Sequence, residues 1–327
     1  MARPPAFNPA GPLTFIVNAA SGQHEEAARR SVIEDALRAA GRRGELVFAK
    51  PDELPAAAQR AAATALATRS AVVAVGGDGT INTVAQAAHA AGCAMGVLPQ
   101  GTFNYFARTH RSPTEPAEAM RALFLATPQP VQVGAVNETV FLVNASVGLY
   151  PDLLEDREAY KARFGRSRLV ALASVGATLL RERRQLPLRI ELGGQARDVR
   201  TPTLFIGNNR LQLEQVGLAD AGDPARAPTP GHMTAVMLRP IGTAAMLWML
   251  VRGAFGALGE ADDVESLEFD RLRVATRSRQ RRLKVAYDGE VAWMRTPLEF
   301  AVSPAPLFLL KSAAAAEGEA AADAAPG

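Results

Sequence analysis

The chain carries, at residues 71–82, the stretch AVVAVGGDGTIN. A short apolar run that stops at glycines is typical of a buried strand in a parallel sheet, and residues 81–91 have the pattern of a helix. A Gly-rich turn between a strand and a helix exposes backbone N–H groups beside the positive end of a helix dipole. Such a turn favours an anion, and phosphate in particular.

Asp78 refines the kind of anion site that this turn predicts. A carboxylate beside phosphates repels them unless a cation lies between, and Mg²⁺ is held by carboxylates and phosphates together. The run matches neither the P-loop nor the dinucleotide fingerprint, and a lone Gly-Asp-Gly turn is more often structural. The residues expected to bind nucleotide phosphates with their magnesium are Gly76, Gly77, Asp78, Gly79, Thr80 and Asn82.

Strands and helices alternate on both sides of this stretch, which predicts a parallel α/β sheet. Strands are expected at 13–18, 45–48, 71–75 and 95–98, and helices at 25–40, 55–68 and 81–91. Ligands bind such sheets at the carboxyl ends of the strands. A second turn at such an end, LPQGTFNYFAR at 98–108, offers Gly101, Thr102 and Asn104 as further donors to a nucleotide.

From about residue 131 the pattern changes to short β-rich runs divided by turns, which predicts a second, mostly antiparallel β domain. The runs are 131–136, 140–145, 187–192, 202–206, 233–238, 268–275, 283–287 and 298–302, with helices near 155–183 and 241–258. We therefore expect an α/β domain over 12–130, to which 305–311 returns, a β-sandwich domain over 131–304, and a disordered tail over 312–327.

Two carboxylates, Asp288 and Glu290, flank Gly289 after the strand at 283–287. One can orient a group or bind metal while the other takes a proton from an attacking hydroxyl. Asp-Gly is also a strong hairpin-turn signal, and taken alone it favours that simpler interpretation.

Composition narrows the class of protein. The chain has 327 residues, enough for about two domains, and is 48% hydrophobic. Its one cysteine, Cys93, cannot form an internal disulfide, which fits a reducing cytoplasm. Its four histidines show no metal-ligand spacing, and residues 1–12 lack the apolar core of a signal peptide. The apolar stretch 241–258 contains Arg252 and indicates a buried or interfacial helix rather than a membrane span.

Arginines cluster at 157–184 and at 271–284. These clusters form either solvated faces or contacts with phosphate or anionic lipid headgroups. Nucleic acid is not expected as a partner, because aromatic residues are not interleaved with the arginines and no nucleic-acid motif is present.

Taken together, these segments resemble the diacylglycerol kinase catalytic family of bacterial lipid kinases, which is related to sphingosine kinases and NAD kinases. The resemblance runs from about Leu13 to Leu310. It is carried by VNAASG at 17–22, GGDGT at 76–80, LPxGTxNxFAR at 98–108, NASVG at 144–148, GNN at 207–209, and DGE at 288–290 followed by PLEF at 297–300.

The resemblance implies a fold and a set of roles. An α/β nucleotide domain would be joined to a C-terminal β-sandwich, with Asn18 and the two Gly-rich turns on ATP and its Mg²⁺. Glu290 would be the general base with Asp288 beside it, and Asp78 would complete the catalytic set. The implied reaction is transfer of the γ-phosphoryl group of ATP to the hydroxyl of diacylglycerol or a related lipid. The enzyme would be cytoplasmic and would dock reversibly on the inner face of the membrane.

Other interpretations stay open. A NAD kinase-like or sugar kinase shares GGDG, although the runs at 98–108 and 288–290 argue against it. A non-catalytic lipid- or nucleotide-binding regulator would not need both Asp78 and Glu290. The sequence leaves the acceptor lipid and the oligomeric state open, a homodimer included. Some bacterial relatives hold a structural magnesium in an Asp-rich loop, but residues 227–232 here contain no acid, so that metal is not expected.

Overall fold

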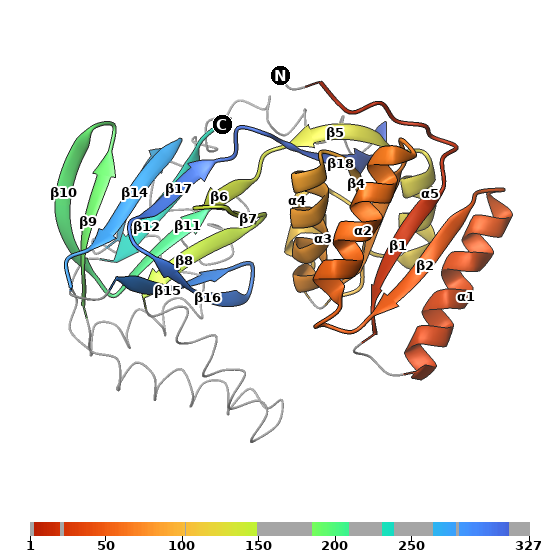
Figure 1. Ribbon diagram of the computed structural model, residues 1–327, viewed down its shortest axis with the longest axis horizontal. Helices are drawn as coiled ribbons and strands as arrows, with labels where there is room; N and C mark the ends of the chain where they lie inside the picture. The colour runs from red at the N-terminus through yellow and green to blue at the C-terminus, as the bar shows by residue number, and fades with distance from the viewer. Residues whose placement is uncertain are drawn as a thin grey trace. The chain divides into compact units, whose positions relative to one another are not determined.

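The computed structural model describes residues 3–19, 23–101, 103–148, 185–208, 231–238, 264–278 and 281–313. The chain forms two compact units, Met1–Val133 with Ser303–Pro326, and Gly134–Val302. In Figure 1, the labelled helices belong to the first unit, and labelled strands are present in both units. The described residues contain no helix with the length and apolarity needed to cross a bilayer.

The first unit is built on one six-stranded sheet, ordered β2-β1-β3-β4-β18-β5. The first five strands in this order run parallel, and β5 runs antiparallel to β18. The strands are β1 (Leu13–Asn18), β2 (Gly44–Ala49), β3 (Ala71–Gly76), β4 (Ala94–Pro99), β5 (Thr127–Val131) and β18 (Leu307–Lys311). The late segment β18 therefore lies inside the N-terminal sheet, between β4 and β5.

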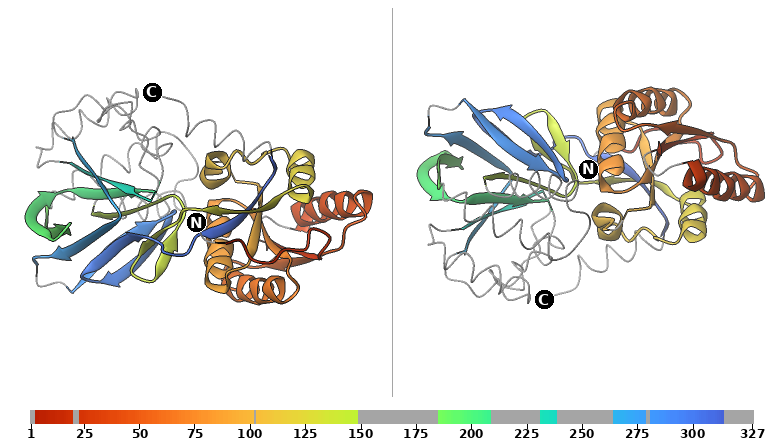
Figure 2. Two further views of the ribbon diagram at one scale, coloured as in Figure 1. Left: turned by 90° about the horizontal axis from the view of Figure 1, so that it is seen from above. Right: turned by 90° about the horizontal axis from the view of Figure 1, so that it is seen from below.

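Helices cover both faces of this sheet (Figure 2). They are α1 (Gln23–Ala39), α2 (Leu54–Ala67), α3 (Asp78–Ala91), α4 (Tyr105–Thr109) and α5 (Pro116–Phe124). Helices α1 and α5 bury Ile33, Leu37, Met120 and Leu123 against alternate residues of β1 and β3, while α2 and α3 pack together. Because both faces are covered, every residue of β3 is buried, which explains its continuous apolar run.

The second unit consists of two antiparallel sheets, ordered β10-β9-β14-β17-β6-β7 and β13-β12-β11-β8-β15-β16. Both sheets contribute to one hydrophobic core that includes Phe141, Phe269 and Phe300. The strands are β6 (Gly134–Val136), β7 (Thr139–Phe141), β8 (Asn144–Gly148), β9 (Leu186–Leu192), β10 (Gln195–Thr201), β11 (Thr203–Gly207), β12 (Met233–Leu238), β13 (Val264–Phe269), β14 (Arg271–Thr276), β15 (Arg282–Tyr287), β16 (Glu290–Arg295) and β17 (Leu298–Val302).

The predicted fold class, an α/β domain followed by a β-rich domain, is confirmed. Three β-rich runs were each predicted as one strand, and this prediction was wrong. Each run forms two strands that belong to different sheets. The run 268–275 divides at Asp270 between β13 and β14, 140–145 divides between β7 and β8, and 131–136 divides between β5 and β6. Apolar residues continue through Leu142 and Val143, and only Gln132 or the pair Asp270 and Arg271 interrupts the other two runs, so the pattern alone does not reveal the breaks. The sequence also missed β10 and β16.

Candidate functional site

The Gly-rich turn is shorter than the sequence predicted. Strand β3 ends at Gly76 and α3 begins at Asp78 rather than at residue 81, so Gly77 alone separates them. Gly77 is the N-cap residue, with an extended backbone (φ −85°), and a glycine has no side chain with which to cap. Asp78, Gly79 and Thr80 therefore form the first helical turn, whose N–H groups point toward the end of the sheet.

The two Gly-rich turns are in backbone contact. A Cβ on Gly101 would lie 2.7 Å from the Cα of Gly77, and one on Gly76 would lie 2.7 Å from Oγ1 of Thr80. The N–H of Gln100 donates to the carbonyl of Gly76 at 2.8 Å, which fixes the second turn to the first. Glycine is required at 101 because no side chain fits between the two turns.

Asn104 closes the second turn on itself. Its Oδ1 accepts from the N–H of Gly101 and its Nδ2 donates to the carbonyl of Gly101, both at 2.8 Å. Asn104 has a left-handed backbone (φ 51°), which asparagine adopts more easily than most residues. In this structure its amide holds the turn in shape, and its predicted contact with nucleotide stays a prediction.

Asn18 and Asn82 occupy different positions around α3. Nδ2 of Asn18, at the carboxyl end of β1, donates to Oγ1 of Thr80 at 3.2 Å, so these two predicted residues lie together. Asn82 is buried at 2% exposure, and its Oδ1 accepts from Gln86 at 2.9 Å. Asn82 therefore stabilises α3 from within, and its contact with nucleotide stays a prediction.

The Asp78 carboxylate lies between the two turns. Burial raises its pKa, while the backbone N–H groups of Phe106, Tyr105 and Asn104 at the start of α4 lower it. Oδ1 of Asp78 is buried and has no hydrogen-bond partner in the described part of the chain. A buried oxygen without a partner costs free energy, so this atom is suited to accept a cation or a donor from a ligand.

The magnesium expectation fits this arrangement. The described residues contain no cluster of three His, Cys, Asp or Glu that would hold a metal by itself. Mg²⁺ that arrives with nucleotide needs only one or two protein carboxylates, because phosphates and waters complete its coordination. Asp78 is the carboxylate that would hold it.

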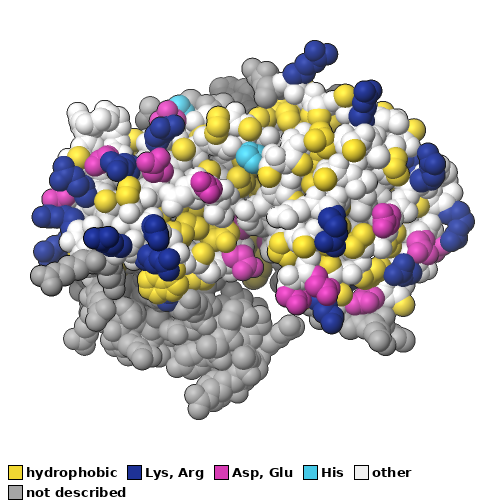
Figure 3. Space-filling view, in the orientation of Figure 1, with side chains coloured by type: hydrophobic (Ala, Val, Ile, Leu, Met, Phe, Trp, Pro, Cys, Tyr) yellow, Lys and Arg dark blue, Asp and Glu magenta, His cyan; other side chains and the backbone are white. Residues whose placement is uncertain are grey.

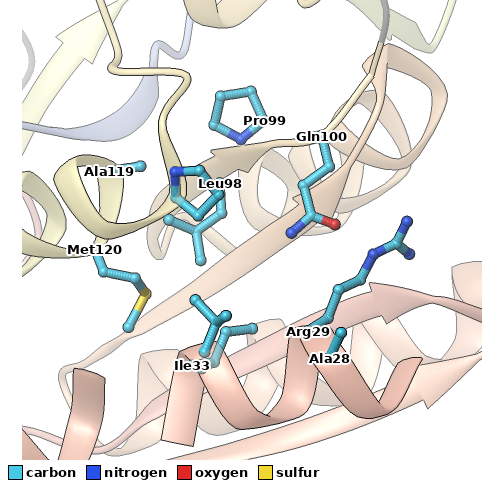
Figure 4. Close-up of a pocket in the computed structure, with 10 residues that line it drawn as sticks. Ala28, Arg29, Ile33, Leu98, Pro99, Gln100, Ala119 and Met120 are labelled. Carbon is cyan, nitrogen blue, oxygen red and sulfur yellow. The ribbon is translucent and has the colours of Figure 1, made fainter. Parts of the chain in front are cut away.

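A small pocket of about 160 Å³ opens beside the second turn (Figure 4). Most of its lining is apolar and comes from α1 and α5, with Arg29 and Gln100 as the polar residues. Oε1 of Gln100 is buried without a partner among the described residues, and Nη1 of Arg29 donates to the carbonyl of Asn18 at 3.4 Å. The sequence did not predict a role for Arg29 or Gln100. The available signal was position, since Gln100 lies inside the run 98–108 and Arg29 follows the segment 17–22.

In the second unit, three motifs distant in sequence meet at residues 142–144. The Asp288 carboxylate accepts from the N–H groups of Leu142, Val143 and Asn144 at 2.7, 2.8 and 3.0 Å. Asn208 donates through Nδ2 to the carbonyl of Leu142 at 2.9 Å. Asp288 is 8% exposed, so this carboxylate is a buried anchor for the crossing from β7 to β8.

Asp288 and Gly289 form the tip of the β15–β16 hairpin. Both have left-handed backbones (φ 45° and 90°), as a two-residue type I′ turn requires. Glu290 follows as the first residue of β16, pairs with Tyr287 and is exposed. Burial raises the pKa of the Tyr287 hydroxyl, and the charges of Glu290 and Asp288 add to the rise. The turn thus fixes where the free carboxylate of Glu290 projects.

Several predicted features lie outside the described residues. They are Thr102, the turn at 20–22, Asn209, the Arg-rich segment 157–184, the helices near 155–183 and 241–258, the loop 227–230 and the tail from 314.

The first unit is a parallel α/β domain with a phosphate-type turn at the carboxyl ends of its strands, and the second is an antiparallel β domain with an anchored hairpin. A family model described as "Diacylglycerol kinase catalytic domain" matches residues 12–136. The resemblance to the diacylglycerol kinase catalytic family is therefore confirmed over residues 12–136.

Curated relatives match over part of their length. The chain is 44% identical over 94 residues to a "Probable lipid kinase YegS-like" of Pseudomonas putida, covering 28% of this chain and 32% of that protein. It is 47% identical over 79 residues to a protein of the same description from Pseudomonas aeruginosa, covering 24% and 26%. The matched segments thus span a third or less of these relatives.

Solved structures share the fold over most of the chain. A putative diacylglycerol kinase from Bacillus anthracis superposes with a TM-score of 0.67 at 19% identity, covering 93% of this chain and 98% of that one. At this identity the likeness establishes the fold alone.

Proposed function

We propose that this protein is an ATP-dependent lipid kinase that transfers the γ-phosphoryl group to a lipid hydroxyl. The observation that carries the proposal is Oδ1 of Asp78 at the start of α3, which is buried and has no hydrogen-bond partner among the described residues, beside two glycine turns in backbone contact. The family match over residues 12–136 and the names of the Pseudomonas relatives support it.

The nucleotide phosphates bind at the first turn of α3. The backbone N–H groups of residues 76–80 and the hydroxyl of Thr80 are the donors, with Thr102 as a further one. Gly101 lets the second turn approach the first, and Asn18 orients Thr80 through their 3.2 Å hydrogen bond. The N-terminal end of a 14-residue helix adds positive potential there. When bound with ATP at Asp78, Mg²⁺ supplies neutralisation of the charge on the phosphates.

Glu290 is the general base. Its carboxylate accepts the proton of the lipid hydroxyl, the hydroxyl oxygen bonds to the γ-phosphorus, and the bond from that phosphorus to the β–γ bridging oxygen breaks as ADP leaves. Phosphoryl transfer has a loose transition state, so positioning supplies most of the acceleration. Asp288 acts as a positioning residue, because its three backbone hydrogen bonds hold the turn from which Glu290 projects.

The acceptor is a membrane lipid with a free hydroxyl, with diacylglycerol the first to test. The proposed location of the enzyme is the cytoplasm, where it acts at the inner face of the membrane. Its oligomeric state, monomer or homodimer, can be measured by analytical ultracentrifugation.

The test is incubation of the protein with γ-³²P-labelled ATP, Mg²⁺ and, in separate reactions, NAD, a sugar or one of a panel of lipids that bear a hydroxyl group, followed by thin-layer chromatography. The proposal predicts label in one lipid, lost on addition of EDTA and in Asp78→Asn. Label in NAD or a sugar instead of lipid would show a small-molecule kinase. No transfer to any acceptor, together with ATP binding by calorimetry, would show a non-catalytic regulator.

A further inference from the structure

The β15–β16 hairpin has two faces of different character. On β15, Leu283 and Val285 point into the core of the second unit, and on β16 Met294 packs against the same core. Side chains alternate along a strand, so the residues between them lie on the opposite face. The register pairs Arg282 with Arg295 and Lys284 with Trp293. The outer face of the hairpin therefore carries these four side chains together, which we call the Trp293 patch.

The Trp293 patch is exposed and basic. Trp293 is 57% exposed, among the few large hydrophobic residues so placed in the described chain. Nζ of Lys284 lies 5.5 Å from the centroid of its ring, and Arg282 and Arg295 are exposed. Figure 3 shows Lys and Arg side chains interspersed with hydrophobic ones over the second unit. β16 is the last strand of its sheet in the described residues, so the patch lies at a sheet edge.

The arginines of the patch differ from those of the other sheet. Nη1 of Arg277 pairs with Asp198 at 2.6 Å, and Nη1 of Arg273 pairs with Glu191 at 3.0 Å. Neither Arg282 nor Arg295 forms an ion pair within the described chain, and each faces the other across the two strands. Two like charges opposite each other are unfavourable without an anion between them. Within the Arg-rich run 271–284, Arg273 and Arg277 are therefore paired with carboxylates, whereas the charge of Arg282 is not balanced by an ion pair in the described chain.

We propose that the Trp293 patch docks the protein on an anionic lipid surface. Tryptophan with lysine and arginine is the combination that prefers the interface of a bilayer, where the ring lies at the headgroups and the cations meet lipid phosphates. Glu290 begins the same strand, about 10 Å from Trp293 along it. Because Glu290 is an odd number of residues from Trp293, its side chain lies on the opposite face of the hairpin. Docking through the patch would therefore hold the enzyme at the membrane that contains its lipid acceptor, without itself aiming the base. The role of docking in reaching a lipid substrate rests on the proposed function, whereas binding of the patch to a lipid surface does not.

Two simpler explanations account for less. Charged residues on an edge strand discourage pairing with other strands, but an exposed tryptophan among them has the opposite effect. A basic and aromatic surface also suits single-stranded nucleic acid, which stacks bases on rings. One tryptophan on a flat strand face offers a single stacking position, whereas a lipid surface uses all four side chains at once.

The experiment is flotation of the full chain with vesicles of phosphatidylcholine alone or with 30% phosphatidylglycerol. The wild type is expected to bind the anionic vesicles and not the neutral ones. Arg282→Glu/Arg295→Glu should weaken that binding at least tenfold, because each basic residue near an anionic surface contributes about a factor of five. Trp293→Ala should weaken it several-fold. In a Trp248→Phe background, the emission of Trp293 should shift to shorter wavelength when anionic vesicles are added.

The matched control is Arg200→Glu/Arg271→Glu, which changes the net charge equally at exposed arginines outside the patch. Circular dichroism and melting temperature confirm that each variant is folded. Equal binding by the patch variants and the control, or binding of a single-stranded oligonucleotide in place of vesicles, overturns the proposal.

Activity separates this proposal from the function on which its purpose rests. With short-chain diacylglycerol dispersed in detergent, the patch variants should keep wild-type activity and lose it only on vesicles. Vesicle binding through the patch without any kinase activity refutes the proposed function and leaves docking intact. Kinase activity with undiminished vesicle binding in the patch variants refutes docking alone.

Discussion

The carboxylate of Asp288 accepts a hydrogen bond from the backbone N–H of Leu142 at 2.7 Å, across 146 residues of sequence. The same carboxylate accepts from the next two N–H groups, and the N–H of Asp288 donates to the carbonyl of Asn144 at 3.0 Å. The side chain therefore binds the hairpin tip to the crossing between the two sheets of the β unit.

Asp288→Ala should lower the free energy of unfolding by about 3–5 kcal/mol, because it leaves buried N–H groups without an acceptor. Urea denaturation monitored by circular dichroism measures the change. Asp198→Ala, which removes an exposed carboxylate paired with Arg277, is the control and should cost at most about 1 kcal/mol. A loss as small for Asp288→Ala as for the control would contradict the anchor role.

Asp78→Asn should stabilise the ligand-free protein at neutral pH while abolishing phosphoryl transfer. Burial raises the pKa of Asp78, so the folded state binds more protons than the unfolded chain from pH 3.8 upward to the raised value. Stability attributable to this group therefore falls as pH rises through that window. The variant should show a flatter dependence of melting temperature on pH and a higher value at pH 7. A lower melting temperature for Asp78→Asn than for the wild type at pH 7 would contradict this prediction.

Glu290→Gln should reduce kcat by about 10²–10⁴-fold, the range typical of a lost general base, with little change in KM for ATP. Its stability should match the wild type, because the side chain is exposed. Glu138→Gln, another exposed carboxylate of the same unit, should leave kcat unchanged. Undiminished transfer by Glu290→Gln would assign the proton to another group.

Gly101→Ala should weaken ATP binding more than Gly77→Ala does. The added Cβ at 101 would lie 2.7 Å from a backbone atom of the other turn, which must move, whereas the Cβ at 77 would meet its neighbour at 3.3 Å. Overpacking of this kind costs about 1–3 kcal/mol. Calorimetric titration with ATP and thermal melts of both variants measure the two effects. Equal affinities would show that the contact between the turns can relax.

The sequence was enough for the order of elements in the first unit. Apolar runs such as 71–75 are continuous because both faces of the strands are covered, and the glycines that end them mark the ligand edge of the sheet. The glycine run includes Thr80, and the family resemblance added Asn18. The structure brings Nδ2 of Asn18 within 3.2 Å of Oγ1 of Thr80. In the second unit the sequence identified most strands but not where they change sheet. Leu142 and Val143 continue the apolar run, and Asp270 is a short charged interruption between two β-rich stretches.

The sequence by itself determined the fold class, the family segments and the residue types of the candidate site, since these depend on local pattern and motif. Tertiary structure decided which of those residues stabilise the local backbone. Asn104, Asn82 and Asp288 hold turns and helices through hydrogen bonds to partners that spacing does not reveal. It also decided that Asp78 keeps a buried oxygen with no partner in the described part of the chain, and that Arg282 and Arg295 face each other beside Trp293. Burial and strand register arise only when distant segments pack together, so no local pattern could show either.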